Sequence, residues 1–567
     1  MEKIWLSSYI EGTPEFIDNA GYDSLRDLIE ENCRAHADKP AYANMGVTLR
    51  FADIDRLSAQ FAAYLQHELG LAKGERVALM MPNILQYPIA LFGVLRAGLV
   101  AVNVNPLYTK RELEHQMNDS GAKAIVIVEN FASTLSAVID KTGLEHVITT
   151  QIGDMLPGLK RMITNVVVKR VKKMVPEFAL PGAATFRQAL AGGAGKTIER
   201  REITLDDLAF LQYTGGTTGV AKGAMLSHGN LVHNVQQSNA WLGNKLDDTP
   251  VIGICALPLY HIFSLEGNCF SLLEQGGLNV LIANPRDFDG FVDELAKYPF
   301  SYFTGVNTLF NALLGHPRFA SLDFSHLRIT IGGGMAVQRA VAEKWRQVTG
   351  TPLIQAYGLT ETSPAAVISP FTEALAYTGA IGLPISSTEV AIIDDDGNHL
   401  AVGEIGEICI RGPQVMQGYW QRPEETENVM EGDWLRTGDV GRMDEKGFIF
   451  IEDRKKDMIL VSGFNVYPNE IEDVVVQMQG IFEAAAVGKP DDKSGEIVKL
   501  YVFADDPSLD AIAVIAYCRE NLTGYKVPKE VVFRDEELPK TNVGKILRRA
   551  LRDACRRRAQ RRGALST

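Results

Sequence analysis

The sequence predicts an α/β fold in which a large N-terminal part, built from parallel-rich sheets covered by helices, precedes a small α+β C-terminal unit. Apolar runs and a helical pattern alternate in the first part, at Arg76–Met81, Ile84–Ala97 and Leu99–Asn103. Strand, helix and strand at this spacing indicate parallel βαβ units with helices on both sheet faces. The polar run Glu452–Asp457 later interrupts the apolar pattern as a linker does. With 567 residues, the chain must also divide into more than one domain.

The elements of the first part are bounded by local signals. Gly98 is suited to end the first helix, because glycine readily adopts the conformation that closes many helices. Thr109 and Glu112 predict a capping box for a helix that ends near Gly121. Ala124–Val128 supplies the next buried strand.

The last hundred residues predict a separate lid. Gly447–Ile451 is predicted as a strand, and the boundary is placed in the polar run after it. Residues 1–453 then form the body, residues 454–457 a hinge and residues 458–567 the lid. Pro468 opens a helix that Gly480 ends. The remaining elements of the lid are strands near 482–488, 497–503 and 530–533 and a helix near 509–521.

Composition narrows the class of protein. The formal net charge of −13 argues against a general nucleic-acid binder. Six cysteines are scattered without a C-x-x-C pair, so neither a disulfide framework nor a zinc site is predicted. The N-terminus carries acidic residues and no long apolar run, and no uncharged apolar stretch reaches the ~18 residues that a membrane span needs. These features predict a cytoplasmic enzyme.

One glycine- and threonine-rich stretch, Tyr213–Met225, has the chemistry of a phosphate-binding loop. Its glycines let the backbone turn tightly and approach a ligand closely, while its hydroxyls and one cation supply polar contacts. It lacks the Gly-Lys-Ser/Thr ending of a Walker A loop. Gly195–Thr197 comes nearest to that ending and is predicted to be a surface loop. The residues that make up this chemistry are Thr214, Gly215, Gly216, Thr217, Thr218, Gly219 and Lys222.

Four further motifs follow this loop, in the order Tyr357–Ser363, Trp434–Asp439, Asp453–Asp457 and Pro539–Lys545. Together with the loop they resemble the adenylate-forming superfamily, whose members activate a carboxylic acid as an acyl adenylate. The resemblance runs over nearly the whole chain. It implies a large adenylate-forming domain of α/β class followed by a mobile α+β lid.

The resemblance implies roles for residues of the body. Glu361 and Thr214 are expected to ligate Mg²⁺, which prefers hard oxygen ligands. Thr360 is expected to bond the α-phosphate, and His261 to lie beside the acyl carboxylate. Considered alone, a single histidine in an apolar setting is more typical of a hydrogen-bonded core residue. The residues expected to hold ATP or AMP are Thr214, Gly215, Gly216, Thr217, Thr218, Gly219, Lys222, Gly332, Gly334, Tyr357, Gly358, Asp439 and Arg454.

Some of these positions have a specific expected contact with the adenine or the ribose. Tyr357 is expected to stack on the adenine, and the Gly332–Gly334 turn to lie flat against it. Asp439 presents two acceptor oxygens suited to a ribose diol, with Arg454 supplying complementary donors.

The resemblance also assigns the lid. Lys545 is expected to offset the repulsion between the acid's carboxylate and the triphosphate, and to stabilise the charge that builds on the α-phosphate. Lys456 stands at the hinge position. After the lid turns, Ser462, Gly463 and Phe464 are expected to line a channel for the pantetheine of CoA.

Within the superfamily, Tyr213–Met225 and Asp453–Pro468 are similar to the bacterial long-chain fatty-acid–CoA ligases. Gly215 stands where serine is usual and Ala221 where proline is usual, and that subgroup shares both departures. The implied reaction joins a fatty acid to CoA through acyl-AMP, with ATP and Mg²⁺. Phe263–Leu273 and Val306–Leu314 suit either an acyl tunnel or core packing.

Several alternatives stay open. Delivery to a carrier protein would replace CoA, although no carrier domain is fused here, and a silent nucleotide-binding protein would keep the fold. A homodimer is compatible with the sequence. Residues 160–175 interleave six cations with apolar residues and suit either an anionic membrane surface, such as the inner membrane, or an exposed helix packed on its own domain. Arg548–Arg562 suits either membrane or CoA phosphates, or a solvated terminal helix.

Overall fold

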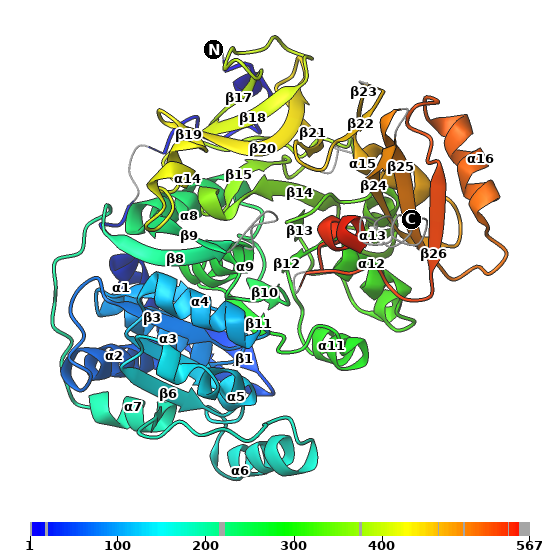
Figure 1. Cartoon of the computed structure of the whole chain (residues 1–567). Coiled ribbons are helices and arrows are strands. Elements are labelled where there is room, and N and C mark those ends of the chain that lie inside the picture. The colour runs from blue at the N-terminus through cyan, green and yellow to red at the C-terminus, as the bar shows by residue number, and fades with distance from the viewer. Residues whose placement is uncertain are drawn as a thin grey trace.

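The computed structural model describes residues 3–17, 21–214, 221–372, 377–462, 464–491, 494–541 and 544–554. Two large sheets and a smaller antiparallel sheet form the body, and the C-terminal residues form a separate sheet with its own helices (Figure 1). The predicted fold class is therefore confirmed.

A seven-stranded sheet contains the first βαβ units. Its strands are parallel except for the last, which runs antiparallel to its neighbour. The order is β7 (Ala184–Thr185), β6 (His146–Thr150), β5 (Ala124–Val128), β3 (Arg76–Met80), β4 (Val100–Asn103), β8 (Leu208–Thr214) and β9 (Lys222–Ser227). The three strands expected between residues 76 and 128 are confirmed as β3, β4 and β5.

The helices between these strands begin and end where their signals predict. Helix α3 spans Gln86–Arg96, and α4 spans Lys110–Ser120. The Thr109–Glu112 capping box is present, and Gly121 closes α4 in the left-handed conformation with φ 60°.

A nine-stranded sheet forms the second half of the body. Its central strands are parallel, and antiparallel strands flank them at both edges. The order is β16 (Leu383–Pro384), β15 (Ala365–Ile368), β14 (Leu353–Gly358), β13 (Ile329–Gly333), β12 (Tyr302–Gly305), β10 (Ile252–Cys255), β11 (Leu278–Leu281), β1 (Pro40–Asn44) and β2 (Val47–Arg50).

Helices fill the space between the two sheets and cover their outer faces. The central layer contains α1 (Leu25–Ala35), α2 (Phe51–His67), α3, α8 (His228–Leu242) and the π-helical η5 (Leu265–Phe270), whose apolar residues share one core with both sheets. The outer layer on the seven-stranded sheet contains α4 and α5 (Ala132–Ser136). The outer layer on the nine-stranded sheet contains α11 (Phe288–Leu295), α12 (Asn307–Gly315) and α13 (Arg339–Thr349).

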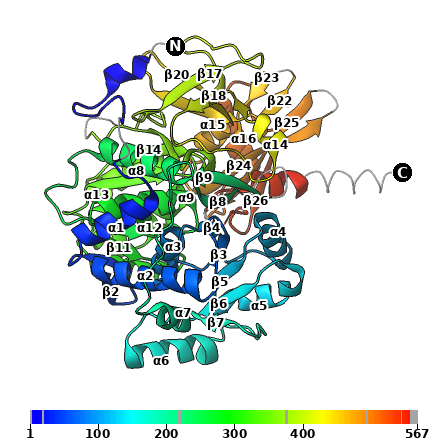
Figure 2. The same cartoon turned by 90° about the vertical axis from the view of Figure 1, so that its left-hand side faces the viewer.

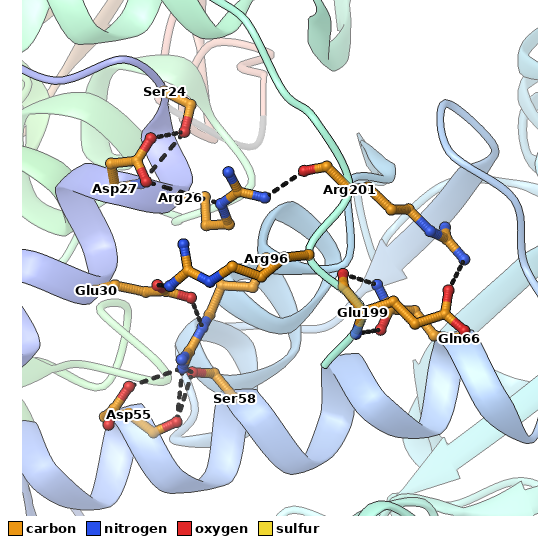
Figure 3. Close-up of polar contacts among 11 residues, drawn as sticks. Ser24, Arg26, Asp27, Glu30, Asp55, Ser58, Gln66, Arg96, Glu199 and Arg201 are labelled. Atoms are coloured by element: carbon orange, nitrogen blue, oxygen red, sulfur yellow. Dashed lines mark hydrogen bonds and ion pairs between the residues drawn. The ribbon is translucent and has the colours of Figure 1, made fainter. Parts of the chain in front are cut away.

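A buried arginine ties three helices of the central layer together (Figure 3). Arg96 of α3 donates to Glu30 Oε1 of α1 at 3.2 Å. It also donates to the Asp55 carbonyl at 2.7 Å and to Ser58 Oγ at 2.8 Å, both on α2. Arg26 of α1 donates to the carbonyl of Arg201 at 2.6 Å, which fixes the segment that leads into β8. The contacts of Arg96 therefore fix the crossing of α1, α2 and α3.

The third sheet is antiparallel and leads into the lid. Its strands are β17 (Glu389–Ile393), β18 (Gly406–Arg411), β20 (Trp434–Met443), β19 (Met430–Glu431) and β21 (Ile449–Arg454). The strand predicted at Gly447–Ile451 extends to Arg454, because Arg454 pairs with Asp439 and Asp453 with Val440. The first half of the expected linker is therefore part of strand β21. Its polar residues are not all exposed, since Asp453 is fully buried.

The lid contains one mixed sheet with α15, α16 and a helical segment at 548–554 (Figures 1 and 2). The helix predicted from Pro468 to Gly480 ends earlier, at Val475, and the two long strands extend beyond their predicted bounds. The elements are β22 (Ile459–Val461), β23 (Phe464–Val466), α15 (Pro468–Val475), β24 (Ile481–Asp491), β25 (Gly495–Ala504), α16 (Ala511–Asn521) and β26 (Glu530–Arg534).

The basic segment at 160–175 forms a helix that projects from the body. Helix α6 (Gly158–Val166) continues into the π-helical η4 (Val167–Val171). Val167, Val168 and Val175 are half-buried, whereas the other apolar side chains are exposed, so the expected stripe is buried only in part. The apolar residues of this segment that are at least half exposed are Leu159, Met162, Ile163, Val166, Val171 and Met174.

Among the described residues, no helix combines the length and apolarity needed to cross a bilayer. Five cysteines are buried and free, and Cys555 lies outside the described residues. The remaining short helices are η1 (Ile4–Ser8), η2 (Glu129–Phe131), η3 (Ile139–Lys141), α7 (Phe186–Gly193), α9 (Ile262–Ser264), α10 (Ser271–Glu274), η6 (Phe319–Ser321), η7 (Thr360–Thr362) and α14 (Pro423–Glu427).

Candidate functional site

The glycine- and threonine-rich loop joins the antiparallel pair β8 and β9. Thr214 and Lys222 face each other in register at the open end of this pair. The predicted loop residues Gly215, Gly216, Thr217, Thr218 and Gly219 lie outside the described residues. The structure therefore fixes the base of the loop, where Thr214 and Lys222 stand.

The base of this loop is held by a segment that the sequence analysis did not single out. Residues 417–420 pair along the free edge of β9, with Met225 N donating to the Gly418 carbonyl at 2.9 Å. Asp119, at the end of α4, accepts from Tyr213 Oη at 2.7 Å and from Arg422 Nη2 at 2.5 Å. Asp119 lies about a hundred residues from Tyr213 in the chain, so no local pattern predicts the contact.

Lys222 and Glu361 converge on Tyr419, which comes from the same missed segment. Tyr419 Oη donates to Glu361 Oε1 at 2.7 Å, and Lys222 Nζ lies 5.0 Å from the centre of the Tyr419 ring. Lys222 also forms an ion pair with Glu425 of α14. Burial lowers the pKa of Lys222, while the Glu361 carboxylate acts to raise it. The structure thus brings the predicted loop cation and the predicted metal ligand together.

Glu361 has the chemistry of a Mg²⁺ ligand. It lies on η7, which packs beside β8 and β9, the strands that carry Thr214 and Lys222. Within the described ranges, no group of three or more His, Cys, Asp or Glu side chains is placed to hold a metal ion. A single carboxylate such as Glu361 fits Mg²⁺, because this ion is usually held by one or two carboxylates plus substrate phosphates and waters.

Tyr357, Asp439 and Arg454 form a connected group from three strands. Tyr357 Oη of β14 donates to Asp439 Oδ2 of β20 at 2.7 Å, and Arg454 Nε of β21 lies 2.8 Å from Asp439 Oδ1. Each carboxylate oxygen has two lone pairs, so both oxygens keep capacity to accept from a diol. Asp439 is nearly fully buried, and its orientation is fixed by both partners.

Two glycines of the predicted adenine site are required by the backbone. A Cβ at Gly358 would lie 1.8 Å from the Pro364 carbonyl oxygen, so no side chain fits between these segments. Gly334 has φ +73°, in the left-handed region that favours glycine. Gly332 lies in β13, where a Cβ would meet Val337. These packing demands explain the three glycines whether or not adenine contacts them.

His261 and Lys545, which are far apart in sequence, act on each other electrostatically. His261 lies at the N-terminus of α9, where its Nδ1 accepts from Phe263 N at 3.4 Å. Burial lowers the pKa of His261 to about 4, and the positive charge of Lys545 adds to this effect. His261 is therefore a neutral imidazole at pH 7.

Lys545 lies among the charges of the predicted nucleotide site. Its pKa is lowered to about 8, first by burial and next by Arg454, while Asp439 acts in the opposite direction. The segment that carries it touches the body, since a Cβ at Gly544 would lie 2.5 Å from Thr308 Oγ1 of α12. Thr541 N donates to the Lys545 carbonyl at 2.7 Å, and Lys545 N donates to Thr541 Oγ1 at 3.1 Å.

Two arginines in the described part of the arginine-rich end, residues 548–554, pair with protein carboxylates. Arg548 is not solvated, because Asp453 and Glu472 pair with it, and Arg552 pairs with Asp457. The guanidinium of Arg548 therefore pairs with protein carboxylates in this structure, and not with phosphates of a membrane or CoA. Residues from 555 onward, including Arg562, lie outside the described residues.

The predicted CoA-channel residues Ser462 and Phe464 are not part of the group around Lys545. They lie on the β22–β23 hairpin at the edge of the lid sheet. Phe464 is 55% exposed, and its ring stacks on Tyr525 with centroids 4.7 Å apart. Ser462 has φ +52°, and its N–H donates to the Ser494 carbonyl. Gly463 is outside the described residues. Of the apolar segments, Phe310 and Leu313 of α12 are fully buried in the core beside Trp345, so core packing accounts for them.

The chain matches two family models. Residues 29–420 match the AMP-binding enzyme model, and residues 470–545 match the AMP-binding enzyme C-terminal domain model. It is 57% identical over 556 residues to a long-chain-fatty-acid–CoA ligase of Escherichia coli O157:H7, covering 98% of this chain and 99% of that one. It is 55% identical over 553 residues to one of Yersinia pestis, covering 98% of both chains.

A solved structure shares the whole fold. The crystal structure of ATP-bound MatB from Rhodopseudomonas palustris superposes with a TM-score of 0.79 at 29% identity, covering 93% of this chain and 98% of that one.

Proposed function

The chain belongs to the family of AMP-binding enzymes, and on this premise we propose that it is a long-chain fatty-acid–CoA ligase. It converts a fatty acid, ATP and CoA into acyl-CoA, AMP and pyrophosphate, with Mg²⁺ as the metal ion. The observation that carries the proposal is 57% identity over nearly the full length of both chains to a ligase of that name. The group of Lys545, Asp439 and Arg454 at one place supports the same chemistry.

The first step forms acyl-AMP. The fatty-acid carboxylate attacks the α-phosphorus of ATP, the bond to the β-phosphate oxygen breaks, and pyrophosphate leaves. Mg²⁺ on the phosphates, held through Glu361 with Thr214 nearby, supplies charge neutralisation when bound. Lys545 carries a positive charge at pH 7, because its pKa of about 8 lies above that pH. It offsets the repulsion between two anions and stabilises the charge on the α-phosphate.

The body positions the nucleotide and the acid. Asp439 accepts from the ribose hydroxyls, and its partners Tyr357 and Arg454 hold the carboxylate still. Thr360 on η7 stands beside Glu361 and bonds the α-phosphate. Neutral His261 lies beside the acyl carboxylate without adding a second positive charge there. Lys222 and the glycine-rich loop hold the β- and γ-phosphates.

The second step transfers the acyl group to CoA. The thiolate sulfur attacks the acyl carbonyl, the carbon–oxygen bond to AMP breaks, and AMP leaves with the bonding electrons. For this step the lid, residues 458–567, turns about Lys456 in the hinge 454–457, withdraws Lys545 and presents Ser462, Gly463 and Phe464 as the pantetheine channel. The exposure of Phe464 on an edge hairpin supports a role that begins after the turn.

The proposal is tested by AMP formation with purified protein across acids from acetate to oleate, with and without CoA. We expect acid-dependent pyrophosphate release that is greatest with long chains, and net acyl-CoA only when CoA is present. A carrier-protein phosphopantetheine serves as the competing acceptor. The absence of acid-dependent pyrophosphate release would support a silent nucleotide-binding protein instead.

We further propose that α6 and η4 contact an anionic membrane surface peripherally. Five apolar side chains are at least half exposed on this segment, and cations alternate with them. An exposed apolar stripe flanked by lysine and arginine suits the interface of an anionic bilayer. A long-chain acid partitions into membranes, so this contact places the enzyme where its substrate is.

Flotation with vesicles of phosphatidylcholine containing phosphatidylglycerol tests this contact. The double variant Ile163→Asp/Val166→Asp is expected to lose binding, because it places two charges on the apolar face. Ile512→Asp on α16 is the matched control, since Ile512 is even more exposed but lies on the lid. Equal binding by all three proteins, or binding independent of the anionic lipid, contradicts the proposal.

A further inference from the structure

Arg548, three residues after Lys545, is the centre of a buried ionic group that includes the end of the body, the hinge and the lid. Its Nε and Nη2 donate to Glu472 Oε1 and Oε2 of α15 at 2.9 and 2.6 Å. Its Nη1 donates to Asp453 Oδ1 of β21 at 3.4 Å and lies 3.8 Å from Asp457 Oδ2 in the hinge. Nη2 also donates to Asn469 Oδ1.

The carboxylates around Arg548 have other fixed partners. Asp453 is fully buried and accepts from Arg454 N at 2.6 Å and from Asn469 N at 2.8 Å. Glu472 Oε1 accepts from Ala486 N at 2.8 Å. A bidentate arginine between carboxylates that are themselves held has one favourable geometry. The position of Arg548 is therefore set by the body and the lid together.

Arg552, four residues further along the same helical segment, makes a second contact with the hinge. Its Nη2 donates to Asp457 Oδ1 at 2.7 Å, and its Nη1 donates to the Lys456 carbonyl at 3.4 Å. Asp453 and the hinge belong to or adjoin the body, whereas both arginines belong to the segment that carries Lys545. Asp453 lies on the body side of residue 456, so any turn of the lid about that residue must break the Arg548–Asp453 contact. The Lys456 carbonyl and Asp457 move with the lid, so the Arg552 contacts can persist.

We propose that Arg548 is a positioning residue that holds Lys545 in the site for acyl-AMP formation and must release Asp453 before acyl transfer to CoA. This inference rests on the proposed two-step function and adds a contact that fixes the first lid position. The contact of Arg548 with Glu472 stays within the lid and survives the turn. The contact with Asp453 crosses residue 456 and is specific to the first step.

The two half-reactions of the full-length protein test the proposal when they are measured separately in Arg548→Gln, Arg548→Lys and Arg552→Gln. Acyl-AMP formation is followed by acid-dependent pyrophosphate release, and acyl transfer by conversion of supplied acyl-AMP and CoA. Arg548→Gln should lower acyl-AMP formation about tenfold, the scale of one charge-assisted hydrogen bond, and leave acyl transfer within about twofold of wild type. Arg548→Lys, which keeps the charge but not the bidentate geometry, should restore part of the loss. Arg552→Gln, whose contacts move with the lid, should leave the ratio of the two half-reactions unchanged.

The matched control is Lys526→Gln. Lys526 donates to both carboxylate oxygens of Glu470 at 2.7 Å, an ion pair wholly within the lid. Its loss should leave the ratio of the two half-reactions unchanged. Asp453→Asn, which weakens the acceptor on the body side of residue 456, should shift that ratio in the same direction as Arg548→Gln.

Equal loss of both half-reactions in Arg548→Gln and Asp453→Asn, or no change in either, would overturn the positioning role and leave the proposed function intact. Failure of the wild-type protein to form acyl-AMP from any acid would instead overturn the proposed function. Thermal unfolding of each variant separates a loss of folded protein from a change in the ratio, because unfolding lowers both half-reactions together.

Discussion

Lys545 is the residue on which the proposed first step depends most. Lys545→Ala removes the cation that lies among Arg454, Asp439 and His261. Loss of such a preorganised charge is expected to lower acyl-AMP formation by about 10²–10³, or 3–4 kcal/mol. Conversion of supplied acyl-AMP to acyl-CoA is expected to persist, because Lys545 is withdrawn for that step. Single-turnover assays of each step check this, and equal loss in both would refute the assigned role.

The same lysine predicts a pH dependence. Its pKa of about 8 means that the ammonium form predominates below pH 8 and is lost above it. The kcat/KM for acyl-AMP formation, which reports the free enzyme, should therefore fall as the pH rises through about 8. His261, with a pKa of about 4, stays neutral across this range and adds no limb between pH 6 and 9.

Lys545→Arg is the control for this assignment. An arginine stays charged throughout the accessible pH range, so the alkaline fall should move out of that range even if the maximal rate is lower. A fall at the same pH in Lys545→Arg would assign the titration to another group.

At the scale of elements, the crossing of α1, α2 and α3 depends on Arg96 (Figure 3). Arg96→Ala leaves the exposed Arg200 as the one ionic partner of Glu30 among the described residues, and it creates a small cavity. We expect a loss of about 3 kcal/mol in the unfolding free energy of the body, at the lower end for breaking a buried pair.

Arg56→Ala on α2 provides the comparison for that loss. The Arg56–Asp53 pair lies at 2.9 Å but is largely exposed, so its removal should cost less than about 1 kcal/mol. Urea unfolding followed by near-ultraviolet circular dichroism measures both variants. If the two variants lose equal stability, Arg96 does not fix the helix crossing.

The elements that the sequence predicted are those with local signals. β3, α3, β4, α4 and β5 follow from an apolar period, a capping box and a closing glycine, all within a few residues. The misplaced boundaries depend on distant partners. β21 continues through Asp453 because that carboxylate has a partner in Arg548, some ninety-five residues later. α6 keeps its apolar face outward, which no pattern within the helix distinguishes from a buried stripe.

At the scale of the whole molecule, the short motifs identified residues of the site but not the residues that hold them in position. Tyr357, Asp439, Arg454 and Lys545 were each identified by a short motif, and the fold brings them together. Asp119 and Tyr419 hold Tyr213 and Glu361 in place, and Arg548 holds the segment that carries Lys545. Each of the three lies in ordinary sequence. Their roles arise only when strands and helices distant in the chain meet, so composition and spacing give no signal for them.

A turn of the lid about residue 456 gives the last prediction. Proline fixes φ near −65° and restricts the residue before it, so Lys456→Pro should oppose rotation at the hinge. Lys455 N donates to the Gly438 carbonyl, and Asp457 N and Met458 N donate to the Arg454 carbonyl, so a proline at 456 retains these three bonds.

Acyl-AMP formation by Lys456→Pro should therefore stay within a few-fold of wild type, whereas conversion of acyl-AMP to acyl-CoA should fall by more than about tenfold. Lys456→Ala, which removes the side chain but leaves the backbone free to rotate, should retain the second step. Acyl transfer at the wild-type rate in Lys456→Pro would mean that the lid turns elsewhere or does not turn. In that case Lys545 and the pantetheine channel would have to serve both steps from the single arrangement in which Gly544 lies against Thr308.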